Sequence, residues 1–160
     1  MDKYMETAYK EALLAKEQGE VPMGAAIYKD EKLIAKAHNL VEQTKDPTAH
    51  AELLAIRAAL ASLGSKNLAG CSLYVTLEPC AMCIGAIHLC KIKRVYFGAY
   101  DAKSGACGGK VDVPWSGCFD YKTEIYGGIA EPECEKLLKD FFESIRREEG
   151  SCGKSVSEAD

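Results

Sequence analysis

Three residues in two short motifs have the side chains of a metal site, and a fourth residue with different chemistry lies beside them. His50 is followed two positions later by Glu52. Pro79 leads into Cys80 and Cys83, which are three positions apart. One imidazole and two thiolates supply three ligands of a tetrahedral zinc ion and leave one position open for water, as in catalytic zinc sites. The motifs therefore predict one zinc ion per chain.

Glu52 is the residue that a purely structural zinc site would not need. Zinc lowers the pKa of a bound water from ~15.7 towards ~7, and a nearby carboxylate can move the released proton to a leaving group. Asp46 or Thr48 could cap a helix that has Pro47 in its first turn. Such a helix would place His50 and Glu52 near its N-terminus. Side chains two positions apart on a helix diverge, so one can bind the metal while the other reaches a substrate.

A second helix should begin near Pro79 and place Cys80 and Cys83 one turn apart on one face. A redox pair or two buried thiols are the alternatives, but neither explains His50 and Glu52 upstream. Glu78 either steadies the metal-binding loop or caps this helix, and capping is the interpretation that we prefer. The other six cysteines have no comparable partners, and we expect them to be small core residues or surface thiols.

Length and composition are those of a soluble globular protein. The chain has 160 residues, of which 48% are hydrophobic and 28% charged, which suits one domain with a sizeable core. No run approaches the ~18 apolar residues of a membrane span, and the N-terminus does not resemble a signal peptide, so we expect a cytoplasmic protein. The net charge of −4 weakens the case for a nucleic-acid partner, although a local basic patch can suffice.

Hydrophobic periodicity predicts alternating helices and strands. Helices are expected over residues 2–18, 46–64, 80–89 and 133–147. Strands are expected over residues 25–28, 33–37, 71–76, 95–97 and 123–126, the first two as a hairpin. The buried strand over 71–76 ends just before Cys80, and open α/β sheets bind ligands at the carboxyl ends of such strands. Residues 1–147 are predicted to form one domain, and residues 148–160 an acidic tail without regular structure.

Several stretches together resemble the zinc-dependent cytidine deaminase superfamily. The signature H-x-E with P-C-x-x-C is that of base deaminases. Within the superfamily the chain is most similar to the bacterial TadA-type tRNA adenosine deaminases, from about residue 20 to about 147. The stretches that carry the resemblance are E-V-P-M-G-A at Glu20 to Ala25, H-N at His38, D-P-T-A-H-A-E at Asp46 to Glu52, L-Y-V-T-L-E-P-C-A-M-C at Leu73 to Cys83, and F-G-A-Y-D-A-K-S-G at Phe97 to Gly105.

This resemblance implies a three-layer α/β/α fold with a five-stranded mixed sheet, and hydrolytic deamination as the reaction. Hydroxide would add to the ring carbon that carries the exocyclic amine, while Glu52 protonates the neighbouring ring nitrogen and then the amine. The leading substrate is adenosine at the wobble position of a tRNA anticodon, with inosine as the product. The resemblance alone also implies a homodimer, with contacts from residues of the second zinc helix: Met82, Ile84, Ile87 and His88.

Substrate contacts are also implied by the resemblance. Asn39 would hydrogen-bond the nucleoside through an amide that both donates and accepts, although a lone Asn at a strand end is often a turn residue. Gly24 and Ala25 would let the backbone approach the substrate, with sheet packing as the alternative reason for their small size.

The long polar loop after residue 100 is a further candidate for substrate contact. The resemblance makes Asp101, Lys103 and Ser104 candidates for contacts to RNA flanking the target base, with a solvated loop as the alternative. Phe119 is a substrate-binding candidate in the stretch Phe119-Asp120-Tyr121-Lys122, which departs from the family pattern of Phe or Met followed by Asn-His. Trp115 is also unusual, and could stack on a base, cover a small pocket or pack in the fold.

Two other functions remain open at this point. A deaminase of a free base or nucleoside, such as guanine, cytosine or adenosine, is favoured by the acidic balance, by Trp115 and by the departure at Asp120. The D-A-K-S-G and V-P-M-G stretches favour the tRNA substrate instead. A zinc-stabilised binding module without catalysis would not need Glu52 and would be expected to supply a fourth protein ligand.

Overall fold

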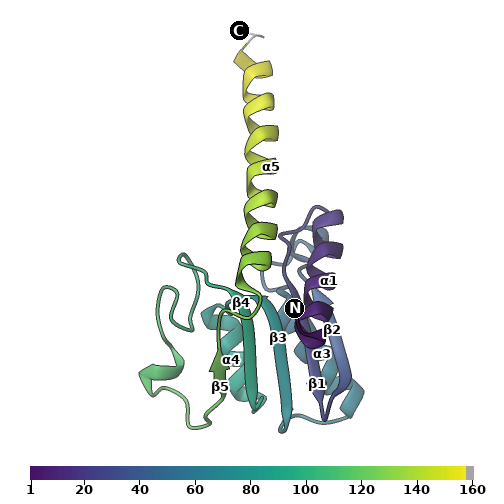
Figure 1. The fold of residues 1–160 in the computed structure, drawn as a ribbon, viewed down its shortest axis with the longest axis vertical. Coiled ribbons are helices and arrows are strands. Elements are labelled where there is room, and N and C mark those ends of the chain that lie inside the picture. The colour runs from purple at the N-terminus through teal and green to yellow at the C-terminus, as the bar shows by residue number, and fades with distance from the viewer. Residues whose placement is uncertain (158–160) are drawn as a thin grey trace.

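A five-stranded mixed sheet forms the middle layer of the computed structural model, which describes residues 1–157 (Figure 1). The strand order is β2-β1-β3-β4-β5. β1 pairs antiparallel with β2 and with β3, whereas β3, β4 and β5 run parallel to one another. The five strands are β1 (Gly24–Lys29), β2 (Lys32–His38), β3 (Cys71–Leu77), β4 (Arg94–Ala99) and β5 (Glu124–Tyr126).

Helices cover both faces of this sheet, which confirms the three-layer α/β/α fold (Figure 1). On one face lie α1 (Lys3–Glu17) and α5 (Glu131–Ser157), and on the other lie α3 (Ala51–Leu63) and α4 (Ala81–Leu89). Two short elements were not predicted from the sequence, α2 (Val41–Thr44) and the 3-10 helix η1 (Pro114–Ser116). The described residues contain no helix that is long and apolar enough to cross a membrane.

The larger part of the hydrophobic core lies between the sheet and the pair α3 and α4. Alanines on α3, among them Ala51 and Ala55, are fully buried and let this helix lie close to β1 and β2. Ile84 and Ile87 of α4 are equally buried, so the monomer core already uses two of the residues that resemblance assigned to a dimer contact. On the opposite face, a smaller cluster packs Met5 of α1 against Ala26 of β1.

α3 begins later than the sequence predicted. His50 is its N-cap, with extended backbone angles, and Ala51 is the first helical residue. Asp46 and Thr48 form a turn instead, in which the Asp46 carboxylate accepts hydrogen bonds from the Thr48 backbone N–H at 2.8 Å and hydroxyl at 2.6 Å. The prediction of a helix over Pro47 was wrong, because Asp, Pro and Thr favour tight turns as strongly as helix starts.

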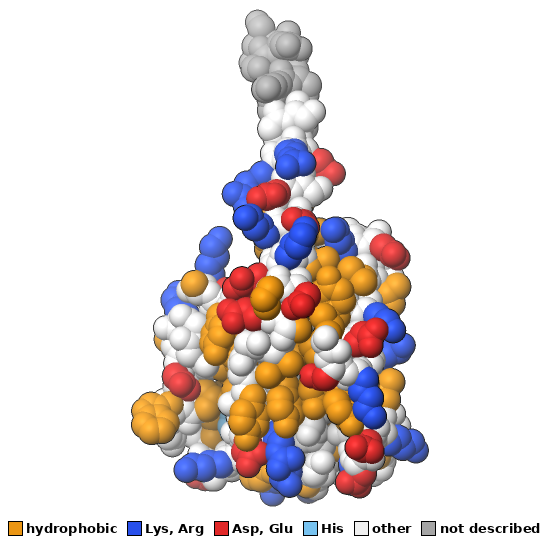
Figure 2. Space-filling model, viewed as in Figure 1, with side chains coloured by type: hydrophobic (Ala, Val, Ile, Leu, Met, Phe, Trp, Pro, Cys, Tyr) orange, Lys and Arg blue, Asp and Glu red, His pale blue; other side chains and the backbone are white. Residues whose placement is uncertain are grey.

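α5 extends beyond the helix that was predicted for residues 133–147. It begins at Glu131 and continues to Ser157, where we had expected an acidic tail without regular structure. A helix that is already nucleated can grow into a charged segment, because each added residue gains a backbone hydrogen bond without a new nucleation cost. Hydrophobic side chains gather on the face below α5, whereas charged side chains surround the helix where it leaves the body (Figure 2).

Candidate active site

The three predicted metal ligands meet at the N-terminal ends of α3 and α4. His50 is the N-cap of α3 and Cys80 the N-cap of α4, and Cys83 lies in the first turn of α4. The His50 Nδ1 atom lies 3.6 Å from the Cys80 Sγ atom and 3.7 Å from the Cys83 Sγ atom. All three ligand atoms lie within 4.8 Å of one another, as the ligands of one metal ion must.

The charges of this cluster suit a zinc ion. A hydrogen bond from the Cys83 side chain, with a further one from His50, lowers the pKa of the Cys80 thiol to about 4. The same hydrogen bond raises the pKa of the Cys83 thiol, so the two sulfur atoms share one proton and Cys80 is the thiolate of the pair, which is the form that binds metals. Among the described residues the cluster has one nitrogen and two sulfur donors and no fourth protein ligand, which matches a catalytic zinc site. When bound there, zinc makes hydroxide available near neutral pH.

Glu52 lies in the first turn of α3, just after the N-cap His50. Its side chain is fully buried, and among the described residues neither carboxylate oxygen has a hydrogen-bond partner. Burial raises the pKa of this carboxyl group, so that it can both accept and release a proton closer to neutral pH. A buried carboxylate without partners is costly, and its presence beside three metal ligands indicates a chemical task.

Asn39 is held directly beside the metal-ligand segment. Its backbone N–H donates to the carbonyl oxygen of Met23 at 3.1 Å, and the next residue, Leu40, donates to the carbonyl oxygen of Ala49 at 3.0 Å. The Asn39 side chain is 4% exposed, and its Oδ1 atom has no partner among the residues that the structure describes. Asn39 thus offers a buried amide oxygen without a protein partner, on a segment whose next residue is hydrogen-bonded to the residue before His50. A substrate contact by Asn39 stays a prediction.

Glu20 supports this arrangement and was not recognised in the sequence. Its carboxylate is fully buried and accepts hydrogen bonds from the backbone N–H groups of Glu42 at 3.0 Å and Gln43 at 2.7 Å. These two donors belong to the first turn of α2, which follows Asn39 by two residues. Glu20 begins the E-V-P-M-G-A stretch that carries part of the family resemblance, but the residue type alone does not indicate burial, because Glu is usually exposed to solvent.

Gly24 and Ala25 differ in what surrounds them. A Cβ atom at Gly24 would lie 1.9 Å from the carbonyl oxygen of Ala8, so close packing against α1 explains the glycine. The backbone N–H of Gly24 donates to the buried Thr76 hydroxyl at 3.1 Å, which ties the start of β1 to β3. Ala25 is fully buried in the core on the α3 side of the sheet. Substrate contacts by these two residues stay a prediction.

The loop after β4 is folded around Glu78. The Glu78 side chain is 2% exposed and accepts hydrogen bonds from three backbone N–H groups, those of Asp101 at 3.0 Å, Cys107 at 2.8 Å and Gly109 at 2.8 Å. The N-cap of α4 is Cys80, and α4 has no side-chain cap. Our preferred interpretation of Glu78 as a helix cap was therefore wrong. Its carboxylate holds the loop that carries Asp101, Lys103 and Ser104.

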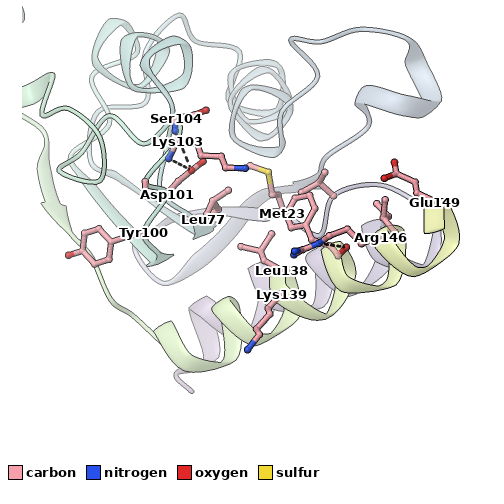
Figure 3. A pocket seen from close by; sticks show the side chains of 14 residues that line it. Met23, Leu77, Tyr100, Asp101, Lys103, Ser104, Leu138, Lys139, Arg146 and Glu149 are labelled. Atoms are coloured by element: carbon pink, nitrogen blue, oxygen red, sulfur yellow. Dashed lines mark hydrogen bonds between the residues drawn. The ribbon is translucent and has the colours of Figure 1, made fainter. Parts of the chain in front are cut away.

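A cavity of about 850 Å³ lies between this loop and α5. Asp101, Lys103 and Ser104 line one side of it, as Figure 3 shows, and α5 supplies residues such as Leu138 and Arg146 on the other. Met23 and Leu77 also line the cavity; the first accepts a hydrogen bond from Asn39 and the second ends the strand before Cys80. The three loop residues of the prediction are thus brought together on one side of this cavity. The metal ligands, Glu52 and Asn39 do not line it, and only Met23 and Leu77 connect it with their segments.

Phe119 lies elsewhere. Its ring stacks on the His88 ring, with the centroids 3.9 Å apart and an angle of 11° between the planes. His88 belongs to the last turn of α4, whereas Cys80 precedes the first turn. Within one chain, Phe119 is therefore not placed with Asn39 and the metal ligands, and the structure does not bring it to the predicted substrate site.

The family follows from a comparison with known sequences. The model of the cytidine and deoxycytidylate deaminase zinc-binding region matches residues 1–99. The chain belongs to this family. The match includes the three metal ligands and Glu52, and it confirms the zinc deaminase signature that the sequence motifs indicated.

Individual relatives extend the similarity to nearly the whole chain. A tRNA-specific adenosine deaminase of Bacillus subtilis is 43% identical over 97% of this chain and 96% of the relative. A protein of the same description from Aquifex aeolicus is 45% identical over 89% of this chain and 94% of the relative.

Solved structures show the same fold. One from a study of A-to-I editing by tRNA:A34 deaminases at the wobble position of transfer RNA has a TM-score of 0.79 and 42% identity, and covers 84% of this chain and 98% of that chain. A guanine deaminase from Bacillus subtilis has a TM-score of 0.59 and 40% identity, and covers 62% of this chain and 66% of that chain.

Proposed function

We propose that this protein converts adenosine to inosine at the wobble position of tRNA, with release of ammonia. One observation carries the proposal. The similarity to proteins described as tRNA-specific adenosine deaminases spans 97% of this chain in one relative and 89% in another. Among solved structures, the one from the study of tRNA:A34 deaminases covers 84% of this chain with a TM-score of 0.79, whereas the guanine deaminase of similar identity covers 62% with a TM-score of 0.59.

The residues of the site have separate tasks in this reaction. His50, Cys80 and Cys83 hold the zinc ion. Glu52 takes one proton from the attacking water and delivers it to the ring nitrogen beside the attacked carbon. It then takes the remaining proton from the hydroxyl group that has been added to that carbon and passes it to the amine, so that the C–N bond breaks, ammonia leaves and the carbonyl group of inosine forms. Its burial raises its pKa, which suits a group that must accept and donate in turn. The free amide oxygen of Asn39 accepts a hydrogen bond from the substrate and fixes its orientation.

The cavity beside α5 supports an RNA substrate. Tyr100 and Phe142 line it and are 48% and 43% exposed, so they offer rings on which unpaired bases can stack. Lys103 and Arg146 also line it and can approach phosphate groups. With Lys139 they outnumber Asp101 and Glu149 among the lining residues, so the cavity carries an excess of positive charge in a chain whose net charge is −4. A free base would leave this cavity unused.

Deamination of free guanine is the second candidate, because a guanine deaminase is 40% identical over the part that it matches. A panel of substrates separates the two functions. The zinc-loaded protein is given an anticodon stem-loop with adenosine at the wobble position, the same loop with cytidine there, and free adenosine, adenine, cytidine, cytosine and guanine. Products are identified by mass spectrometry and ammonia is measured. We expect inosine in the first stem-loop alone, and turnover of a free base with an untouched stem-loop would reject the proposal.

We also propose that the enzyme is a cytoplasmic homodimer. Large apolar side chains are exposed on and after α4, with Met82 38%, Leu89 82% and Trp115 88% exposed. Such side chains on neighbouring elements are typical of an interface between subunits. Sedimentation equilibrium on the wild-type protein and on Leu89→Glu tests this. We expect a dimer that the substitution weakens, and a monomeric wild-type protein at micromolar concentration would contradict it.

A further inference from the structure

We propose that Glu78 is a positioning residue. Its carboxylate holds the loop of residues 101–109, which would contact RNA, against residues 79–83, which carry two zinc ligands. This inference rests on the proposed tRNA substrate. Glu78 is not among the residues that line the cavity, and the three backbone N–H groups that donate to its carboxylate all belong to residues 101–109. A buried carboxylate is stable only when its oxygens are satisfied. The conformation of the loop therefore requires the Glu78 carboxylate as an acceptor, and the burial of that carboxylate requires the N–H groups of the loop.

The two carboxylate oxygens divide the loop between them. Oε1 accepts from Asp101 at the start of the loop, and Oε2 accepts from Cys107 and Gly109 near its end. A Cβ atom at Gly109 would lie 2.2 Å from Oε1, and one at Gly105 would lie 2.4 Å from Oε2. The two glycines thus let the loop backbone wrap closely around this one side chain.

Asp101 in turn fixes the backbone of two residues that line the cavity, Lys103 and Ser104. The Asp101 side-chain Oδ1 atom accepts hydrogen bonds from the backbone N–H groups of Lys103 at 2.9 Å and Ser104 at 3.2 Å (Figure 3). The direction in which Lys103 and Ser104 leave the backbone therefore follows from the place of Asp101. Glu78 fixes that place through the Asp101 N–H group.

The loop is also joined to the zinc-ligand segment itself. The backbone N–H of Ala106 donates to the carbonyl oxygen of Pro79 at 2.9 Å, and Cys80 forms an isolated antiparallel bridge with Gly105. Glu78 lies between β3 and Cys80, so one short segment holds a zinc ligand and the root of the loop. These bonds fix the distance between the zinc site, where the target base reacts, and the loop that would contact the flanking RNA.

Glu78→Gln tests the proposal with almost no change of shape. The amide group has one acceptor oxygen, so its NH2 group must face either Asp101 or the pair Cys107 and Gly109, and the loop loses at least one charge-assisted bond. Lys103 and Lys110 lie in or beside the loop and are cleavage sites for trypsin. We expect cleavage after these two lysines to become about tenfold faster or more, because local opening exposes them.

Glu20→Gln is the matched control. Glu20 is also a buried carboxylate that accepts backbone N–H bonds, but it holds α2, which ends next to Lys45. We expect Glu20→Gln to accelerate cleavage after Lys45 and not after Lys103 or Lys110, with the reverse pattern for Glu78→Gln. Gly109→Ala, which displaces the loop with the Glu78 carboxylate intact, should reproduce the Glu78→Gln pattern if that variant folds poorly.

Kinetics on the stem-loop give the functional result. Because the loop contacts flanking RNA and not the reacting base, we expect KM to rise about tenfold or more with kcat within about threefold of the wild type and the zinc content unchanged. Cleavage rates equal to those of the wild type in both Glu78→Gln and Gly109→Ala, or a loss of zinc with an unchanged KM, would overturn the proposal. If the wild type leaves the stem-loop untouched, the proposed function fails, and the cleavage pattern still decides whether Glu78 holds the loop.

Discussion

His50 and Cys80 occupy the same position in two different helices, since each is the N-cap, and their Nδ1 and Sγ atoms lie 3.6 Å apart. Both side chains therefore leave the backbone just before a helix begins. The two helices converge at their N-terminal ends, where partial positive charge from unpaired N–H groups favours a thiolate. An ion bound there joins two elements of the same face of the sheet.

Removal of zinc should therefore lower the thermal stability as well as abolish activity. Without an ion, two helix ends and three ligand groups lose the bonds that connect them, and binding to the folded state alone stabilises it in proportion to RT ln(1 + [zinc]/Kd). We expect the Tm to fall on chelation and to return when zinc is added back, as followed by circular dichroism. The prediction fails if the Tm is the same at a zinc content of zero and at one ion per chain.

Glu52→Gln should inactivate the enzyme and leave the metal in place. The amide cannot move protons, so we expect activity on the stem-loop to fall at least ~100-fold with unchanged zinc content by mass spectrometry. The buried carboxylate has no partners among the described residues, so its neutral isostere should have a Tm equal to or above that of the wild type. Glu6→Gln, on the exposed side of α1, is the control and should change neither quantity. Substantial activity in Glu52→Gln would remove Glu52 from the mechanism.

Gly98→Ala should destabilise the junction of β4 and α5. The added Cβ would lie 2.5 Å from the Sγ atom of the buried Cys134 and 2.7 Å from the carbonyl oxygen of Thr76. Relief requires a shift of α5 or β4, at a cost of about 1–3 kcal/mol. Gly150→Ala, at an exposed helical position of α5, is the matched control, because none of the described residues lies within 4 Å of its added Cβ and a helical position favours Ala by about 0.5–1 kcal/mol. Urea unfolding should show opposite signs for the two variants, and equal stabilities would contradict the packing argument.

Tyr74 should make the protein sensitive to high pH. Burial raises the pKa of its phenol from 10.0 to about 12, and its ring stacks on Tyr96 with centroids 4.6 Å apart. The folded state thus keeps a proton that the unfolded state releases above pH 10. The stabilising contribution is complete below pH 10 and is lost as the pH rises towards about 12.

Urea titrations at pH 8 and pH 11 measure this contribution. Stability should fall more between the two values in the wild type than in Tyr74→Phe, which keeps the ring and lacks the ionising group. Parallel losses in the two proteins would show that Tyr74 ionises at its ordinary pKa.

The metal site could be predicted from the sequence because its residue types and spacing are rare for any other reason. His50, Cys80 and Cys83 were placed correctly even though the start of α3 was not, since the ligands follow from side-chain chemistry and the helix start from ambiguous signals. Asp46 shows that ambiguity, because its carboxylate caps a turn and not a helix. The mixed sheet was likewise expected from the resemblance and from the order of strands and helices.

The supporting carboxylates could not be predicted in the same way. Glu20 and Glu78 are single acidic residues whose partners are backbone N–H groups 22 to 31 positions away. Which donors they meet depends on how α2 and the loop after β4 fold back, and a backbone group carries no identity in the sequence. Phe119 was instead assigned to the substrate site, and its ring stacks on His88. Its position depends on a loop with little periodicity, so the sequence does not indicate where the side chain lies.

The position of β3 between β1 and β4 determines when the protein can acquire its metal. His50 follows β2 and Cys80 follows β3, so the ligands meet only after β3 has inserted beside β1, where Ala25 pairs with Val75. Such pairings between distant segments form slowly. A nascent chain that has left the ribosome only as far as α3 offers a single ligand. The three ligands are therefore complete only when the chain has emerged as far as Cys83 and β3 has paired with β1, whereas β4 and β5 can join the sheet afterwards.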